Sequence, residues 1–159
     1  MAMAREPYET LERQGLPIVR QLSVFLDNRL GQLLRLTQII EQKDVKILGL
    51  SVSDSVDYAV VRMIFDSPDV ARAVLREAGF AVSVSEVIVV RLPPGKRGLL
   101  TVWQCLLSSE INIGYCYPLL PDALGGAIVL SADNLEIATD TLIRYKLDVL
   151  GESDLRSSP

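Results

Sequence analysis

The sequence contains no histidine and only two cysteines in 159 residues. Histidine is the commonest metal ligand and the commonest general base, so its absence argues against a metal centre and against most acid–base enzymes. A zinc site would need more thiolates than the two widely spaced ones, Cys105 and Cys116. We therefore expect no catalytic residues, no metal and no cofactor. Reduced, packed cysteines explain both thiols, although a disulfide between them stays open.

Long apolar runs and basic clusters are also missing. No apolar run reaches the ~18 residues that span a bilayer, and the charged N-terminus lacks the apolar stretch of a secretion signal. The net charge is −4 and the basic residues are scattered, whereas nucleic-acid binders usually carry a basic patch. Phe25 and Tyr58 are too sparse a pair of aromatics for an RNA-binding sheet. These absences predict a cytoplasmic protein that binds neither a membrane nor nucleic acid.

A repeat of one strand–helix–strand–strand–helix–strand pattern is what the chain does contain. A glycine turn at 27–31 opens a helix that leads into a strand from Val45, and a turn at 94–98 does the same before a strand from Ile111. This order is the split β-α-β arrangement. We predict an α+β fold of two ferredoxin-like βαββαβ units with antiparallel sheets and helices on one face. The first helix should bury one broad stripe, made of Leu30, Leu33, Leu34, Leu36, Ile39 and Ile40.

The repeat also predicts domain boundaries. We expect an N-terminal arm over 1–16, a first unit over 17–85, a second unit over 86–151 and a flexible tail over 152–159. The boundary falls inside an apolar stretch, 80–92, that exceeds the usual strand length of about 3–10 residues and changes its apolar phase near Ser85. The last strand of the first unit should therefore run into the first strand of the second.

Size and hydropathy together predict association. A unit of roughly 65–70 residues buries only about 60% of its unfolded surface and is marginal alone. Yet 49% of the residues are apolar and the mean hydropathy is +0.29. Both facts fit if the halves cover one another and a second chain, so we expect a homodimer.

The run from Leu22 to Leu33 (LSVFLDNRLGQL) resembles the opening of an ACT domain, a regulatory module that binds amino acids. The second copy keeps Gly98 and the Ile-Asn-Ile strand start at 111–113. Together the copies resemble the stand-alone tandem ACT proteins over about residues 17–151. The resemblance implies a small ligand, usually an amino acid, held between the first strand–helix turn of one unit and the second strand of a neighbour.

The positions that match this site make physical sense as ligand-binding residues. A helix start presents unpaired N–H groups to a carboxylate, and glycine lets a ligand approach the backbone. In the first copy the candidates are Asp27, Asn28, Arg29, Leu30 and Gly31, with Gly49, Leu50 and Ser51 on the second strand. In the second copy they are Lys96, Arg97 and Gly98, with Gly114 and Tyr115.

Each candidate also has a purely structural interpretation. Asn28 can serve as a helix N-cap, Gly31 can serve the turn geometry, and Gly49 and Gly114 can mark bulges or close packing. Leu30 stands where the family commonly has proline, and the second turn carries Lys96 and Arg97 in place of Asn or Asp. The two sites are therefore not equivalent. We expect amino-acid recognition in the first copy, while the second takes a more anionic ligand or only pairs with the first.

Three functions remain to be compared. The first is an amino-acid-responsive regulatory protein, and the second is a ligand-free dimerisation module that docks on an enzyme or regulator. The second would not need the polar turn at Asp27 and Asn28. The third is a small enzyme, which the absence of histidine and the scattered acidic residues disfavour. We therefore expect a non-enzymatic regulatory protein, with the docking module as the alternative.

Overall fold

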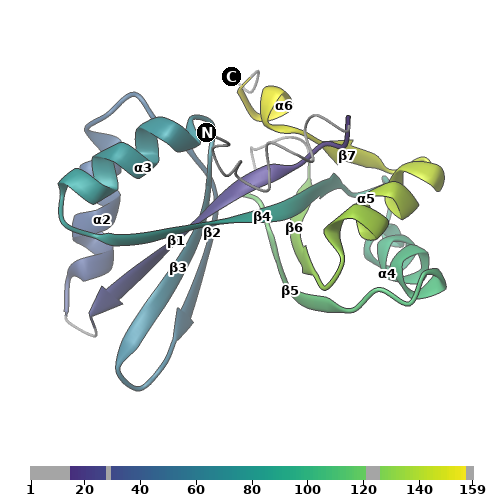
Figure 1. The fold of residues 1–159 in the computed structure, drawn as a ribbon, viewed down its shortest axis with the longest axis horizontal. Helices are drawn as coiled ribbons and strands as arrows, with labels where there is room; N and C mark the ends of the chain where they lie inside the picture. Colours follow the sequence, from purple (N-terminus) through teal and green to yellow (C-terminus); the bar gives the residue numbers. More distant parts are fainter. Residues whose placement is uncertain (1–14, 28–29, 121–125, 157–159) are drawn as a thin grey trace, which may run out of the picture.

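The protein folds into two α+β units that share one strand (Figure 1). The computed structural model describes residues 15–27, 30–120 and 126–156. The predicted N-terminal arm lies largely outside these residues. In chain order the elements are β1 (Val19–Asp27), α2 (Gln32–Glu41), β2 (Ile47–Asp54), β3 (Tyr58–Phe65), α3 (Pro68–Glu77), β4 (Ala81–Arg91), α4 (Gly98–Ser108), β5 (Ile113–Pro118), β6 (Ala127–Ala132), α5 (Leu135–Arg144), β7 (Asp148–Leu150) and α6 (Glu152–Arg156).

The strand pairing confirms the predicted fold class. All the strand pairs are antiparallel, and the order β2-β3-β1-β4-β6-β5, with β7 also beside β4, gives each unit the ferredoxin-like arrangement. Helices α2 and α3 cover one face of the first unit, and α4 and α5 cover one face of the second (Figure 1). None of the helices in the described residues is both long enough and apolar enough to cross a membrane.

Strand β4 belongs to both units. It pairs with β1 over residues 81–87 and with β6 over residues 88–91, so the predicted fusion of two strands is present. The predicted change of apolar phase is wrong. Even-numbered residues face the helices throughout, as Val84 and Ile88 do, while Val87 and Val89 are apolar because the opposite face is buried as well.

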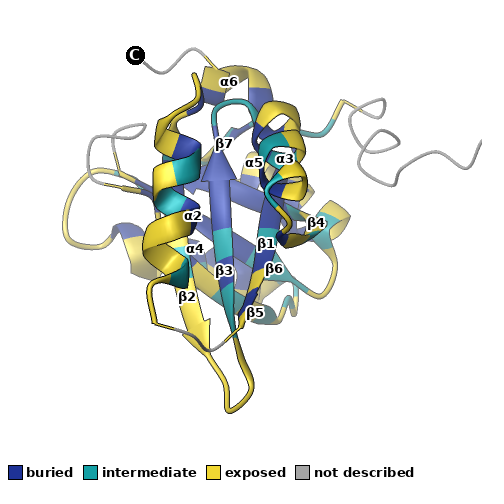
Figure 2. Cartoon of the chain, turned by 90° about the vertical axis from the view of Figure 1, so that its left-hand side faces the viewer, coloured by how far each residue is buried: buried dark blue, intermediate teal, exposed yellow. Residues whose placement is uncertain are grey.

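A third core lies between the helix-free faces of the two units. Leu48 and Ile64 of the first unit pack in one cluster with Tyr117 and Leu119 of the second. The edges also touch, because Leu120 N donates to Leu48 O over 2.9 Å and a β-bridge joins Gly49 to Leu119. The halves thus cover one another, although Figure 2 shows that the far ends of β2 and β3 stay exposed.

The broad buried stripe predicted for the first helix is wrong in its first turn. Leu36 and Ile40 are fully buried in α2, whereas Leu30, Leu33 and Leu34 are exposed. The helix rests on the sheet through its second half, since its buried residues are Leu36 and Ile40. The start of the helix therefore presents leucines to the outside.

The predicted flexible tail is wrong over Glu152–Arg156, which form α6. Leu155 is 1% exposed and joins the core between the units, and the buried Glu152 side chain accepts hydrogen bonds from Arg20. A polar composition predicts a loose end, but these two contacts hold the segment. Residues 157–159 lie outside the described residues.

Candidate functional site

The turn between β1 and α2 carries the first group of predicted ligand-binding residues. Asp27 is exposed at the end of β1, Leu30 is fully exposed, and Asn28 and Arg29 lie outside the described residues. Gly31 takes the N-cap position with φ +85°, without a side-chain cap hydrogen bond, and no acidic residue occupies the first turn of α2. The first N–H groups of a helix lack intrahelical partners and carry its positive dipole end. The turn therefore offers an anion a positive, accessible helix start.

Gly31 itself has open space around it. A Cβ at this position would meet no atom within 4 Å, but the left-handed backbone favours glycine. The turn geometry thus requires Gly31, as one of its two interpretations supposed, and its surroundings also leave room for a guest.

The strand residues of the first unit have separate environments. Gly49 is buried where the β2 register shifts, and a Cβ there would stand 2.6 Å from Leu119 Cδ2, which fits a bulge and close packing. Ser51 is partly buried in β2. Leu50 is 37% exposed and lines a pocket of about 670 Å³. Leu120 of the second unit lines the same pocket, whose other lining residues belong to the first unit, mainly to the end of α2, the start of β2 and the segment between them.

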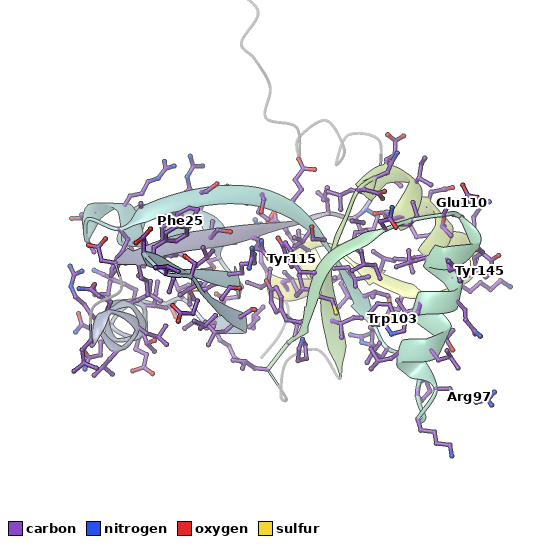
Figure 3. The ribbon with its side chains drawn as sticks, turned by 90° about the horizontal axis from the view of Figure 1, so that it is seen from below. Phe25, Arg97, Trp103, Glu110, Tyr115 and Tyr145 are labelled. Carbon is purple, nitrogen blue, oxygen red and sulfur yellow. The ribbon has the colours of Figure 1, made fainter. Side chains whose placement is uncertain are left out.

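In the second unit the turn before α4 is more tightly packed. Lys96 and Arg97 are exposed, and Arg97 points away from the body of the molecule in Figure 3. Gly98 is buried, and a Cβ there would stand 2.7 Å from the backbone carbonyl oxygen of Pro93. Close packing of the backbone therefore explains Gly98, and it leaves no space for a ligand at this glycine.

Gly114 and Tyr115 lie on β5 at the junction of the two units. The register of β5 shifts between Ile113 and Tyr115, which places Gly114 at a bulge. The Tyr115 hydroxyl accepts a hydrogen bond from Gln21 Nε2 over 2.7 Å, and the Arg62 guanidinium lies 4.2 Å from the centre of its ring. Tyr115 is thus bound to β1 and β3 of the first unit, at the centre of the molecule in Figure 3.

Gln21 is the main residue that sequence reasoning missed. It is fully buried, and besides Tyr115 it binds the Tyr117 hydroxyl, which donates to Gln21 Oε1 over 2.7 Å. Burial, together with the neighbouring Tyr115, raises the pKa of Tyr117 above its ordinary value, although Arg62 acts the other way. Two signals were present in the sequence: a glutamine inside an apolar strand, and two tyrosines alternating on one strand face.

One chain does not bring a predicted turn beside a predicted strand of the other unit. Tyr115 meets β1 at Gln21, and Asp27 lies about 20 Å further along that strand, at ~3.3 Å per residue. Among the described residues, Tyr115 of β5 therefore does not face the first turn of its own chain.

The described residues contain no group of three or more Cys, Asp or Glu side chains placed to hold a metal ion. Cys105 is buried and Cys116 is exposed, and both are free thiols. Burial raises the pKa of the Cys105 thiol, with a smaller opposing effect of Arg144. Cys105 is therefore protonated and packed at neutral pH.

Comparison with known proteins decides the family. The sequence matches the ACT domain pair family over residues 17–158. The chain belongs to this family. This confirms the resemblance to a tandem ACT protein, and no curated protein matches the chain.

The fold is also similar to that of solved structures. Protein BT0572 from Bacteroides thetaiotaomicron is 26% identical, with a TM-score of 0.81 over 89% of this chain and 98% of that one. The ligand-free regulatory subunit of aspartate kinase from Thermus thermophilus is 11% identical, with a TM-score of 0.54 over 81% of this chain and 92% of that one. The second likeness shows the fold alone.

Proposed function

We propose that this ACT pair is a regulatory protein rather than an enzyme, and that it binds an amino acid. The ligand lies between the turn at residues 27–31 of one copy and a strand of a second copy in a homodimer. Membership of the ACT pair family over residues 17–158 supports the regulatory role. The observation that carries the site is the accessible start of α2, where Gly31 leaves the first helical turn without a side-chain cap.

The chemistry of this turn suits a zwitterion. The N–H groups and dipole of α2 attract a carboxylate, and the exposed Asp27 carboxylate attracts an ammonium group. Leu30, fully exposed beside them, offers apolar contact to the ligand's side chain. The first turn is preferred over the second because Gly98 is packed against the Pro93 carbonyl oxygen.

A second copy supplies the facing strand. Within one chain Tyr115 of β5 is fixed beside Gln21, too far along β1 to cover the turn. The exposed Leu30, Leu33 and Leu34 also give a neighbouring copy apolar surface to bury. A ligand held between copies regulates by favouring one arrangement of the pair over another.

A thermal-shift screen against the twenty amino acids tests this proposal. A ligand at 100 times its dissociation constant adds about 2.7 kcal/mol to stability when it binds the native state only. We expect one or a few amino acids to stabilise the protein, and Asp27→Ala and Asn28→Ala to remove the effect. Gln38→Ala, an exposed change later on α2, is the matched control and keeps it.

A ligand-free docking module is the second candidate. One observation favours it: α4 has no charged residue and exposes Leu99, Leu100 and Leu107. If no amino acid stabilises a protein that is dimeric, the amino-acid proposal is overturned and the docking module replaces it.

A further inference from the structure

The helix-free face of the first unit is only half covered by the second unit. On β1 and β3, Val24 and Val61 pack under the helices, so the alternate residues Phe25 and Val60 point to the opposite face. Tyr115 covers this face at Gln21, and the half beyond Gln21 has no cover among the described residues. We call this surface the open face and define it by Phe25, Asp27, Tyr58, Val60 and Arg62, with serines of β1, β2 and β4 around them.

The open face has an apolar centre. Phe25 is 42% exposed and Tyr58 is 46% exposed, with ring centroids 6.2 Å apart. The surrounding positions include the uncharged Ser23, Ser53 and Ser83. Aromatic side chains on an otherwise uncharged surface are typical of the centre of a protein interface.

The two charged residues on the open face are opposite in sign and placed symmetrically. Phe25 pairs with Val60 across β1 and β3, Asp27 lies two residues beyond Phe25, and Arg62 lies two residues beyond Val60 in the other direction. Each charge is therefore about 7 Å along the strands from the Phe25–Val60 pair. Among the described residues Arg62 contacts the Tyr115 ring and forms no ion pair.

We propose that the open face packs against the same face of a second copy of this chain. The two-fold axis lies between the sheets and crosses the strands at the Phe25–Val60 pair. An isologous interface brings each surface onto itself, so Arg62 of each copy meets Asp27 of the other. The Phe25 side chains of the two copies meet near the axis, and no like charges oppose each other there. Tyr58, which pairs with Asp27, comes to the level of Arg62 of the other copy. The pattern of one acid and one base on either side of an apolar centre makes the face complementary to itself.

This packing extends the proposed ligand site, and that extension rests on the proposed function. Tyr115 contacts β1 at Gln21. Arg62 pairs with Ser23 of β1, so Tyr115 lies two residues further from Asp27 along β1 than Arg62 does. When Arg62 of the second copy faces Asp27, Tyr115 of that copy comes to the end of β1 where the turn begins. The second copy then supplies β5 as the strand that faces the turn at 27–31.

Sedimentation velocity without any ligand tests the packing. Arg62→Glu and Asp27→Arg each place like charges opposite one another, and each should raise the dimer dissociation constant about tenfold or more. The double variant restores an opposite-charge pair and returns the constant to near the wild-type value. Arg76→Glu, the same reversal on the exposed side of α3, is the matched control and leaves the constant unchanged.

A cross-link gives a second readout that does not depend on the charges. In a Cys116→Ser background, Phe25→Cys lies near the axis and should form a disulfide-linked dimer under mild oxidation. Thr101→Cys on α4, exposed and far from the open face, should stay monomeric on a non-reducing gel.

The proposed packing is overturned if the wild-type protein is a monomer. It is also overturned if neither charge reversal changes the dimer dissociation constant and Phe25→Cys forms no cross-link. A dimer that dissociates with Leu107→Gln on α4, but not with the reversals, also overturns it. Amino-acid stabilisation in a dimer of that kind would leave the proposed function standing without this packing. A dimer that follows the charge swap but gains no stability from any amino acid would leave the packing standing alone.

Discussion

Arg20 in β1 and Glu152 in α6 form a buried ion pair, with Arg20 Nε 2.9 Å from Glu152 Oε1 and 3.1 Å from Oε2. Arg20 Nη1 also donates to Asp69 Oδ1 at the start of α3 over 2.7 Å. Burial alone would lower the pKa of Arg20, but hydrogen bonds from its guanidinium to Asp69 and Glu152 outweigh burial and raise it above its ordinary value. One guanidinium therefore joins the first strand to α3 and to the last helix of the chain.

Removing the buried carboxylate should destabilise the protein strongly. Glu152→Ala removes a buried carboxylate that accepts hydrogen bonds from the Arg20 guanidinium, and breaking such a pair costs about 3 kcal/mol. Urea unfolding measures this loss of free energy. Asp140→Ala breaks the exposed pair between Asp140 and Arg144 and should cost less than about 1 kcal/mol. Equal losses in the two variants would contradict the account of the buried pair.

The Asp69 carboxylate should contribute to the loss of stability at low pH. Its hydrogen bond from Arg20 holds the pKa of Asp69 below its ordinary value. A lowered folded-state pKa stabilises the protein above the unfolded pKa, about 4, and this contribution is lost as the pH falls through the folded value. Asp69→Asn should therefore flatten the fall of the unfolding free energy below about pH 4. A curve of unchanged slope would refute this role.

Tyr117 should contribute to the loss of folding stability at high pH. Burial raises its pKa, so the folded state holds this proton when an unfolded tyrosine, with a pKa of about 10, releases it. Stability should therefore fall above about pH 10, and Tyr117→Phe should make that fall shallower. At neutral pH the variant loses about 1–2 kcal/mol because Gln21 Oε1 loses its donor. Tyr145→Phe, at a 58% exposed position, is the control and should change neither quantity.

The glycines of the second unit should differ in their tolerance of a methyl group. Gly98→Ala places Cβ 2.7 Å from the Pro93 carbonyl oxygen, a backbone atom, and should cost about 1–3 kcal/mol. Gly114→Ala meets its nearest atom, Ser131 Oγ, at 3.4 Å and should cost less. Thermal unfolding of both variants checks the order. Equal midpoints would mean that the turn before α4 can open to admit the methyl group.

Local sequence patterns predicted most of the fold. The almost continuous apolar run at residues 58–65 forms β3, and the repeat of element types predicted both units. The phase of β4 failed for a physical reason: residues 87–90 are buried on both faces, so alternation disappears where two cores share one strand. Predicting the buried face of a strand from alternating apolar residues assumes that one face is buried and the other is exposed to solvent. The prediction fails where both faces are buried.

The environment of the candidate site was harder to predict because it depends on contacts between distant segments. The sequence indicated the turn at 27–31 from its own residues. It showed an unusual glutamine in one strand and two alternating tyrosines in another, but not that Gln21 would bind Tyr115 and Tyr117. The leucines at the start of α2 look like core residues to a helical-periodicity argument. Their exposure depends on how far along the helix the sheet reaches, which only the folded chain defines.

The continuity of β4 has a mechanical consequence. Two modules joined by a flexible linker can reorient independently, but here a single strand is hydrogen-bonded into both sheets. A tilt of the first module therefore also moves the half of β4 that is hydrogen-bonded into the second module. The shared strand thus couples the orientations of the two modules directly.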